Sequence, residues 1–377
     1  MRCARLSSHQ SVMTFINNVS IIRISQHMNS NPYLNYLNSF GRKRHHRYNC
    51  VSLFSGGGGL DLGASMAGFK SLLVSDVNPT FTETLKNNIP HVNVYNDDAM
   101  KLTPEGVARL AGNPDSIDLI IAGPPCQAFS ILGSRKSMDD PRGKLTIKYF
   151  ELVAGLHPKA FLFENVPGLL NVNDGKDFES LYKFISDTTG YTLFKTKLNA
   201  MNFGVPQARE RLFIVGFRPD VDSSHFKFPI KSSAPSKFNM PSLVPSGFAL
   251  EKVDGLPNQS VRPHTKAVIE RFSKVPQGGR DRGSYCDRID PKEPSHTIVV
   301  GSSAGGARPH IHPTEDRVIT VREAARLQSF PDWYVFTGSS TEQYRQVGNA
   351  VPPLLAYEVT KQIRKILDDD CKRKAVS

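Results

Sequence analysis

Long apolar runs and paired cysteines are absent from the 377-residue sequence. No run approaches the roughly 18 apolar residues that a transmembrane helix needs, so we expect a soluble, cytoplasmic protein without membrane contacts. The five cysteines, at 3, 50, 126, 286 and 371, include no pair spaced as in a zinc ribbon or a dithiol redox site, so no metal is expected. Their odd number, without a secretory signal, suits a reducing compartment in which Cys126 stays a free thiol.

Carboxylates are scarce as well: 35 Asp and Glu stand against 47 Lys and Arg, giving a formal charge of +12 and a pI near 9.4. Such a balance favours a polyanionic partner, with nucleic acid ahead of an anionic membrane. The excess is uneven, because residues 1–60 hold 7 of the basic residues and the first carboxylate is Asp61. Net charge therefore only supports a nucleic-acid partner and does not establish one.

The first 48 residues show no sustained helical or strand period and end in a basic run at 41–47. We expect a poorly ordered, dispensable extension here. Three alternatives stay open: an organelle-targeting segment, an arm that touches nucleic-acid phosphates, or an overlong reading frame with its true start at Met13 or Met28.

Four consecutive glycines, at 56–59, lie between an expected strand at 50–54 and an expected helix from Asp61. Consecutive glycines permit positive φ and let the backbone approach a ligand closely. The dinucleotide pattern GxGxxG fails, because Asp61 or Leu62 stands where the third glycine should be. The phosphate-loop pattern fails because Ala64 replaces its lysine. The loop therefore favours neither a nicotinamide nor a nucleoside triphosphate.

A second expected strand, at 71–75, ends at Asp76. A carboxylate at this place can accept both hydroxyl hydrogens of a ribose. Asn78 and Pro79 follow, and this pair predicts a helix start with an Asn N-cap and Pro in the first turn. The same logic predicts a helix start at Thr103-Pro104.

Cys126 stands in the stretch Gly-Pro-Pro-Cys-Gln at 123–127, directly after the apolar run Asp118–Ala122. This run predicts a buried parallel strand, and the ends of such strands are where open α/β sheets bind ligands. The two prolines restrict the backbone, which favours a stiff loop. A free cysteine is usually a small buried hydrophobe, but the polar neighbours and the strand-end position favour a nucleophilic thiol.

Strands and helices alternate over residues 49–218, which predicts an α/β domain with a mainly parallel sheet and right-handed crossovers. Residues 219–316 are rich in Pro, Ser and Gly and weakly periodic, which predicts a smaller, loop-rich second domain. Order returns over 317–377, where Thr320 and Glu323 have the spacing of a capping box. A final helix near 353–367 is expected to dock back onto the first domain.

Five motifs follow in order: the glycine loop, Gly-Pro-Pro-Cys-Gln at 123–127, Glu-Asn-Val at 164–166, Gln-Ala-Arg-Glu-Arg at 207–211 and Gly-Asn-Ala-Val-Pro at 348–352. This series resembles the DNA (cytosine-5) methyltransferases of bacterial restriction-modification systems, from about Val51 to the last helix. The resemblance implies a Rossmann-like, S-adenosylmethionine-dependent methyltransferase fold with residues 219–316 as the target-recognition domain. It also implies a monomer that acts on duplex DNA in the nucleoid, and it leaves room for a cognate restriction endonuclease.

The resemblance assigns the chemistry to four residues. Cys126 would add to carbon 6 of a cytosine turned out of the duplex, and carbon 5 would then take the methyl group. Glu164, protonated in a water-poor pocket, would neutralise ring nitrogen 3; the alternative is a carboxylate that only pairs with an arginine. Arg209 and Arg211 are two apart on an extended segment and share a face. Arg211 matches the residue that holds the cytosine oxygen and Glu164, whereas Arg209 supports the loop.

For the donor, S-adenosylmethionine, the resemblance places Asp76 on the ribose and Asp98, in preference to Asp97, on the adenine. A turn or N-cap role is the alternative for Asp98. The other expected pocket residues are Phe54, Gly56, Gly58, Pro125, Leu145 and Asn349, of which Leu145 could instead be a core residue. Contacts with DNA are expected from Gln127 and Ser130 beside the thiol, and from Arg280 and Arg282 in the recognition domain.

Two rival functions stay open at this stage. An RNA (tRNA) cytosine-5 methyltransferase would keep the chemistry and change the substrate, although a recognition region of about eighty residues suits duplex reading. A catalytically inactive DNA-binding regulator is disfavoured because Cys126, Glu164 and Arg211 are all present. Amino-group methyltransferases are disfavoured by Gly123 and Cys126 on either side of Pro-Pro.

Overall fold

The computed structural model describes residues 31–42, 45–125, 141–300, 307–308 and 310–375. Its α-helices are α2 (Pro32–Ser39), α3 (Gly59–Met66), α4 (Pro79–Asn88), α5 (Pro104–Leu110), α6 (Pro141–Leu156), α7 (Lys176–Thr189), α8 (Ala234–Lys237), α9 (Gly247–Leu250), α10 (Lys266–Ser273), α11 (Val321–Leu327), α12 (Ser340–Asn349) and α13 (Pro353–Lys374). Within the described ranges, no helix combines the length and the apolar character needed to cross a membrane.

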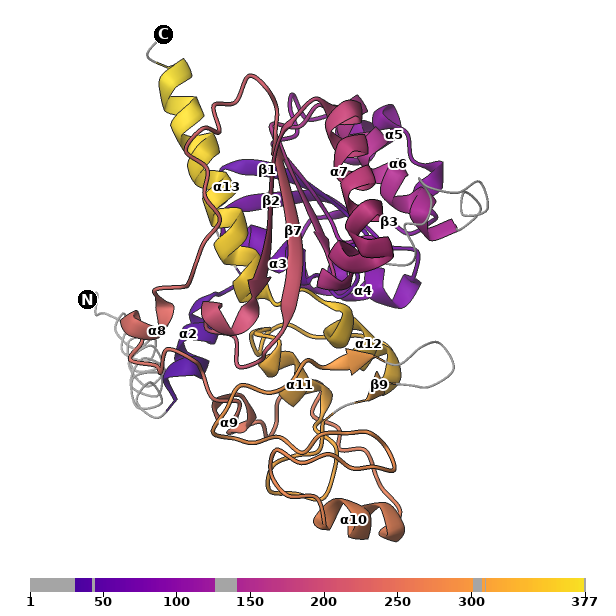
Figure 1. The fold of residues 1–377 in the computed structure, drawn as a ribbon, viewed down its shortest axis with the longest axis vertical. Helices are drawn as coiled ribbons and strands as arrows, with labels where there is room; N and C mark the ends of the chain where they lie inside the picture. The colour runs from indigo at the N-terminus through magenta and orange to yellow at the C-terminus, as the bar shows by residue number, and fades with distance from the viewer. Residues whose placement is uncertain (1–30, 43–44, 126–140, 301–306, 309, 376–377) are drawn as a thin grey trace, which may run out of the picture.

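The strands form one large sheet and one short hairpin (Figure 1). The large sheet contains β1 (Tyr48–Leu53), β2 (Phe69–Ser75), β3 (Asn93–Tyr95), β4 (Leu119–Ala122), β5 (Ala160–Asn165), β6 (Thr192–Asn199) and β7 (Glu210–Phe217). The hairpin pairs β8 (Val299–Val300) with β9 (Ala307–Arg308), and the 3-10 helices are η1 (Ala99–Lys101), η2 (Pro167–Gly175) and η3 (Ala200–Phe203).

Seven strands run in the order β3-β2-β1-β4-β5-β7-β6. The pairs from β3 to β5 are parallel, whereas β7 is antiparallel to both of its neighbours. The predicted α/β class and mainly parallel sheet are therefore confirmed. The chain adds β2 and β3 on one side of β1 and then crosses to β4 on the other, so the strand order switches between β1 and β4. Ligands bind outside the carboxyl ends of the strands at such a switch point.

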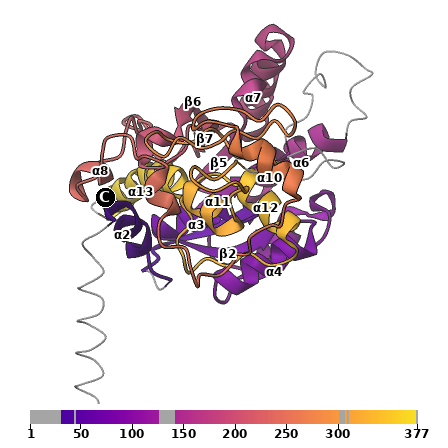
Figure 2. The same ribbon diagram turned by 90° about the horizontal axis from the view of Figure 1, so that it is seen from below.

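Helices cover both faces of the sheet, as expected for strands that are apolar on both sides. On one face, Leu119 and Ile121 share a core with α3 and α13. On the other face, Ile120 and Ala122 pack with residues of α5, α6 and α7. Figure 2 shows these two helical layers on opposite sides of the sheet. The expected return of the last helix is confirmed, since α13 lies against α3.

Local capping explains where several helices begin. The side chain of Asn78 accepts from Thr80 N and precedes Pro79, and the side chain of Thr103 accepts from Gly106 N in the same way. The predicted capping box is also present, because Thr320 and Glu323 each accept from the other's backbone N–H. Satisfying the free N–H groups of the first turn fixes these helix starts.

Residues 31–42 differ from the poorly ordered extension expected for 1–48. They include α2, whose Tyr33 and Leu37 are fully buried. Tyr33 Oη donates to the carbonyl of Arg326 at 2.5 Å, and the indole N–H of Trp333 donates to the carbonyl of Phe40 at 2.7 Å. The sequence prediction was wrong for this stretch because α2 has only 8 residues, and a helix this short has too few apolar positions to show a helical period. Residues 1–30 lie outside the described ranges.

The second domain begins later than the predicted boundary at 219. Val221 and Phe226 are buried in the core of the larger lobe, where the ring of Phe226 lies 5.0 Å from that of Phe217. Asp222 pairs with Arg373 of α13. This segment therefore runs along α13 before the chain enters the smaller lobe, as Figure 1 shows.

The smaller lobe contains α9, α10, α11, α12 and the β8–β9 hairpin, joined by long loops (Figure 1). Its distal part has only a small apolar cluster of Phe272, Cys286, Ile311 and Val318. The guanidinium of the buried Arg288 donates to the carbonyls of Phe272 and His312 and pairs with Asp316 at 2.6 Å. Hydrogen bonds from this side chain to loop carbonyls thus connect several loops of the lobe.

The crossing of α3 and α13 leaves no room for a side chain at residue 63. A Cβ at Gly63 would lie 2.7 Å from both the carbonyl oxygen of Pro353 and the backbone nitrogen of Tyr357. We expect Gly63→Ala to lower the free energy of unfolding by about 1–3 kcal/mol, because backbone atoms would have to move. Urea unfolding measures this change. Gly41→Ala, with no atom within 4 Å of the added Cβ, is the control, and an equal loss in both variants would contradict the packing argument.

Candidate active site

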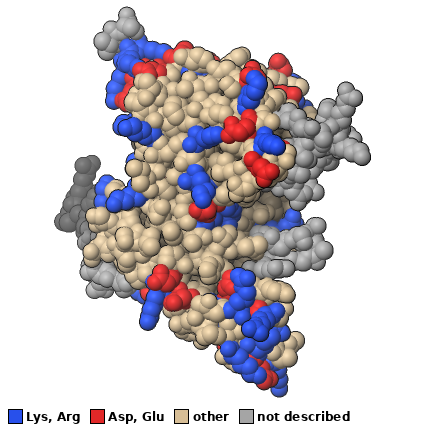
Figure 3. All heavy atoms as spheres, in the orientation of Figure 1, with Lys and Arg blue, Asp and Glu red and all other residues tan. Residues whose placement is uncertain are grey.

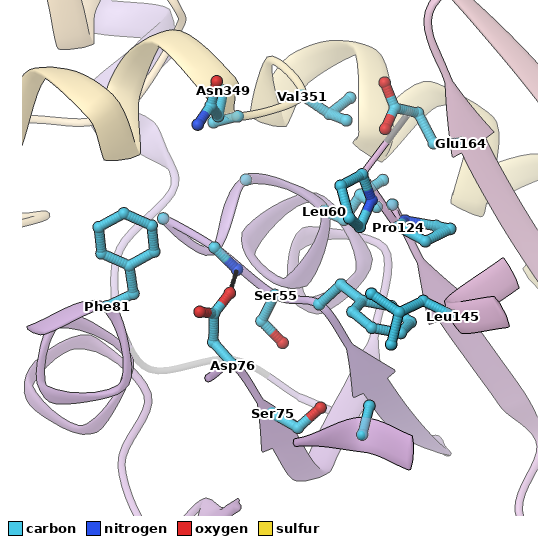
Figure 4. A pocket seen from close by; sticks show the side chains of 18 of the residues that line it. Ser55, Leu60, Ser75, Asp76, Phe81, Pro124, Leu145, Glu164, Asn349 and Val351 are labelled. Atoms are coloured by element: carbon cyan, nitrogen blue, oxygen red, sulfur yellow. Dashed lines mark hydrogen bonds between the residues drawn. The ribbon is translucent and has the colours of Figure 1, made fainter. Parts of the chain in front are cut away.

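A cavity of about 710 Å³ opens at the carboxyl ends of β1, β2, β4 and β5, where the strand order switches between β1 and β4. Figure 4 shows that side chains from all of these strand ends line the cavity, together with Asn349 and Val351 from the C-terminal part of the chain. Its lining includes seven of the eight predicted donor residues, namely Phe54, Gly56, Asp76, Asp98, Pro125, Leu145 and Asn349. Glu164 and Arg211 line the same cavity.

Gly56 and Asp76 join the first two strand ends. Gly56 has a φ of +54°, and no atom lies within 4 Å of a Cβ built on it. Its N–H donates to the Asp76 carboxylate at 3.0 Å, the bond drawn in Figure 4, and Asn78 N donates to the other oxygen at 2.9 Å. Burial raises the pKa of Asp76, partly offset by these two bonds. The carboxylate is thereby held at the cavity wall with lone pairs left for a ligand.

The glycines of the loop were expected to let the backbone approach a ligand, but the other three allow close packing of the protein itself. A Cβ at Gly57 would lie 2.7 Å from the carbonyl oxygen of Gln346, and at Gly59 it would collide with the carbonyl of Val351. Gly58, at φ +78°, packs against the hydroxyl of Tyr334 and does not line the cavity. These three glycines therefore admit the returning C-terminal segment. Gly57 and Gly59 also line the cavity, and Gly56 is the loop glycine with open space beside its Cα.

Asp98 combines a place in the cavity wall with the N-cap role considered as its alternative. It lines the cavity, and its side chain is the N-cap of η1, accepting from Met100 N at 2.9 Å. Asp97 also reaches the cavity but pairs with Lys101 at 2.8 Å. Val77 and Phe81, which the sequence analysis did not name, add apolar surface to the lining. Phe81 lies in the first turn of α4, directly after the Asn78 cap, and that position could have suggested it.

Phe54 adopts an unusual backbone conformation at the end of β1. Its φ is +55°, a region that non-glycine residues enter at a cost of about 1 kcal/mol or more. Residues in such conformations concentrate at functional sites, where surrounding packing holds them. Phe54 lines the cavity next to Leu145 from α6.

Glu164 and Arg211 form an ion pair inside the cavity. Nε of Arg211 lies 2.8 Å from Oε1 of Glu164, and both side chains are about one-tenth exposed. Burial raises the pKa of Glu164, while the charges of Arg211 and Arg209 act against it; the net direction is upward. The site can therefore hold a carboxyl group that is poised to gain or give a proton.

Arg209 does not share the position of Arg211. Its side chain is 1% exposed, and its guanidinium donates to the carbonyls of Gly348 at 2.7 Å and Ile298 at 3.3 Å. Residue 209 is therefore bonded to the backbone of the smaller lobe and of the C-terminal segment. The role expected for Arg209, support of the loop, stays a prediction.

The remaining predicted residues fall into two groups. Cys126, Gln127 and Ser130 fall outside the described residues, and the last described residue before them, Pro125, lines the cavity. Arg280 is paired with Asp287 at 2.5 Å in the smaller lobe, and neither it nor Arg282 lines the cavity. Among the described residues, no group of three or more His, Cys, Asp and Glu side chains is placed to hold a metal ion.

Gly123 and Asn165 line the cavity, although the sequence analysis assigned neither of them a role in the site. Gly123 lies directly after β4 and Asn165 at the end of β5. Both belong to the quoted motifs, at 123–127 and 164–166, but nothing in the sequence shows which motif residues contact a neighbouring segment.

Comparison with known proteins agrees with this geometry. Residues 48–365 match the family described as C-5 cytosine-specific DNA methylase. The type II methyltransferase M.Eco47II of Escherichia coli is 34% identical over 351 residues, covering 86% of this chain and 81% of that protein. M.FnuDI of Fusobacterium nucleatum is 33% identical over 355 residues, covering 86% and 96%.

Solved structures show the same fold. A prophage-encoded E. coli protein described as a DNA modification methyltransferase has a TM-score of 0.68 and 28% identity, covering 85% of this chain and all of that one. The Dnmt2 methyltransferase of S. pombe, at 21% identity and a TM-score of 0.61, covers 86% of this chain and 99% of its own and supports the fold alone. With its cavity, its motifs and a family match over most of its length, the chain belongs to the C-5 cytosine-specific DNA methylases.

Proposed function

We propose that this protein transfers a methyl group from S-adenosylmethionine to carbon 5 of cytosine in duplex DNA, with Cys126 as the nucleophile. The observation that carries the proposal is that a buried carboxyl–guanidinium pair, Glu164 and Arg211, shares one cavity with the carboxylate of Asp76. One end of the cavity thus suits a pyrimidine and the other a ribose. Pro125, at its wall, is bonded to Cys126 in the chain.

The cavity residues fit the donor. The volume lies within the range typical of small-molecule sites, about 300–1,000 Å³. Asp76 would accept from the ribose hydroxyls, Asp98 would accept from the adenine amino group, and Val77 and Phe81 would contact the adenine ring. Phe54, the open side of Gly56 and Asn349 would surround the methionine part. S-adenosylmethionine, when bound there, supplies an electrophilic methyl group.

Cys126 would make carbon 5 reactive by a reversible addition. Its thiolate forms a bond from Sγ to carbon 6, and the electron pair of the ring double bond moves to give an enamine with a nucleophilic carbon 5. After carbon 5 has gained the methyl group, it loses its proton to a base. The Sγ–carbon 6 bond then breaks and the ring double bond is restored.

Glu164 and Arg211 would neutralise the negative charge that develops on the ring in this step. Attack at carbon 6 pushes electron density onto ring nitrogen 3, where the protonated carboxyl of Glu164 can deliver a proton. The carboxylate that remains is then paired with Arg211, 2.8 Å away, and it takes the proton back from ring nitrogen 3 when the Sγ–carbon 6 bond breaks. Arg211 would also donate to the cytosine oxygen. Burial, which raises the pKa of Glu164, favours the proton-carrying form at the start.

The cytosine has to leave the duplex to reach this cavity, at a cost of a few kcal/mol. We assign Gln127 and Ser130 to contacts with the displaced nucleotide's strand, and the smaller lobe to sequence reading. Figure 3 shows Lys and Arg gathered near α10 at the tip of that lobe, among Asp and Glu. Because Arg280 is already paired with Asp287, Arg282 is the better placed of the two for a DNA contact.

The proposal extends to the protein's setting. As a member of a family whose relatives include type II methyltransferases, it would act as a monomer on nucleoid DNA, alongside an endonuclease that cuts the same unmethylated site. Sequencing of converted DNA from cells that make the protein identifies the methylated site. Protection of that site against cleavage by the endonuclease then tests the partnership.

Replacement of the nucleophile gives the most direct test. We expect Cys126→Ala to abolish transfer of labelled methyl groups to duplex DNA, because no other group would activate carbon 5. Cys371→Ala, an exposed cysteine on α13, is the matched control and should retain full transfer. Undiminished transfer by Cys126→Ala would rule out the mechanism. Transfer to tRNA but not to duplex DNA would favour the RNA alternative.

The pH dependence tests Glu164. Its pKa is raised in the fold, so the required protonated form is lost as pH increases through that raised value, and kcat should decline on the alkaline side. Glu164→Gln should lower kcat by about 10²–10⁴-fold and remove this decline, because an amide cannot transfer a proton. Glu210→Gln, an exposed carboxyl at the start of β7, should leave the profile unchanged. A Glu164→Gln profile that matches the wild type would contradict this role.

Donor binding tests Asp76 without any need for catalysis. We expect Asp76→Ala to weaken binding of S-adenosylhomocysteine by about 10- to 100-fold, since hydrogen bonds to a charged group contribute about 1.5–3 kcal/mol. Isothermal titration calorimetry gives the dissociation constants. Asp115→Ala, at an exposed position before β4, should bind as the wild type does. Equal affinities for the two variants would remove Asp76 from the donor site.

A further inference from the structure

The ends of β4 and β5 carry the two halves of the proposed chemistry. Their ladder pairs Leu119 with Ala160 and ends where Ala122 pairs with Phe163. Beyond it, the chain of β4 continues into Gly123-Pro124-Pro125, while β5 continues through Glu164 and Asn165. Because no backbone ladder fixes the two segments beyond residue 122, other contacts have to set their separation.

Asn165 supplies one of these contacts. Its side chain is 3% exposed, and its amide nitrogen donates to the carbonyl of Pro124 at 3.3 Å. Its amide oxygen accepts from Val166 N at 2.8 Å. The first bond crosses from β5 to the segment after β4, whereas the second is local. An amide at this position therefore joins the two segments in a way that neither an alanine nor a carboxylate can reproduce.

Gly123 supplies the other. A Cβ at this residue would lie 2.8 Å from Oε2 of Glu164, closer than such atoms approach. The other carboxylate oxygen of Glu164 lies 2.8 Å from Nε of Arg211. The carboxyl group is thus held between the Arg211 guanidinium and the bare Cα of Gly123. Any side chain at 123 would push this carboxyl out of its place, and because the carboxyl is the end of a flexible side chain, the fold would survive.

We propose that Asn165 and Gly123 are positioning residues that set the Pro124-Pro125 segment at a fixed distance from the Glu164 carboxyl group. Asn165 holds the Pro124-Pro125 segment close to β5 by its bond to the carbonyl of Pro124. Gly123, which has no side chain, allows the same segment to approach the Glu164 carboxyl group, so that both can act on one pyrimidine ring. Neither residue needs to touch the substrate. The inference rests on the proposed function, since it concerns the relative placement of its two reacting sides.

The test uses the full-length protein and steady-state methyl transfer to duplex DNA. We expect Asn165→Ala and Gly123→Ala to lower kcat by about 10- to 100-fold, the effect of a misplacement of about 1 Å, with KM for donor and DNA changed by less than about threefold. Asn165→Asp keeps the acceptor for Val166 N and loses the donor to Pro124, so its kcat should fall at least as far. In Gly123→Ala the alkaline decline of kcat should also shift, because Glu164 changes its surroundings.

Two matched variants separate positioning from general stability. Asn88→Ala removes another buried amide that bridges two segments, through bonds to Val335, and should lower the melting temperature while kcat stays unchanged. Gly168→Ala adds a methyl group where no atom lies within 4 Å, just past the same strand, and should change neither quantity.

The inference is overturned if Asn165→Asp or Gly123→Ala keeps the wild-type kcat, or if Asn165→Ala lowers the melting temperature and leaves kcat unchanged, as Asn88→Ala is expected to do. Those outcomes leave the proposed function intact, because the wild type is active. A wild-type protein that transfers no methyl group to duplex DNA would instead overturn the proposed function itself.

Discussion

The close contact between the glycine loop and the returning C-terminal segment is the constraint on which this structure depends. Gly57 and Gly59 allow the backbone near Gln346 and Val351 to approach to a distance that any side chain would forbid. The Tyr334 hydroxyl adds a 2.9 Å hydrogen bond to the carbonyl of Gly57. Residues almost 300 positions apart thereby enclose one cavity, so the site does not exist until both ends of the chain have folded together.

Within that cavity, burial and the nearby arginines act in opposite directions on the pKa of Glu164. An isolated carboxyl in this buried place would be held neutral, whereas the nearby guanidinium of Arg211 favours the anion. Burial is the larger influence on the pKa of Glu164, and the Arg211 guanidinium lies 2.8 Å from the carboxyl, close enough to pair with its anionic form. The desolvation of a buried ion pair can cost as much free energy as the attraction between its charges returns, so the pair adds little to stability. Its presence in the cavity is better explained by a catalytic role.

The sequence was sufficient for features that arise locally or from ordered motifs. The alternation of elements predicted the sheet, and the caps at Asn78, Thr103 and Thr320 were correct because capping depends on neighbours three residues apart. Contacts between distant segments were not predictable. Helix α2 is ordered by Trp333 and Arg326, almost 300 residues away, and the role of Gly58 depends on Tyr334. Asn165 was missed for the same reason, since its partner is in another loop.

The junction between the lobes explains how one chemistry can be combined with different recognition loops. Gln207 and Ala208 bond to the chain of the smaller lobe through Ser295, Thr297 and Ile298. Arg209 adds bonds to the carbonyls of Ile298 and Gly348, and Gln207 adds one to the carbonyl of Leu327. Most of the groups that the smaller lobe and the C-terminal segment contribute to these bonds are backbone atoms. The exceptions are the hydroxyls of Ser295 and Thr297, which donate to the carbonyls of Pro206 and Ala208. Side-chain substitutions at the positions that contribute only backbone atoms would therefore leave these hydrogen bonds in place.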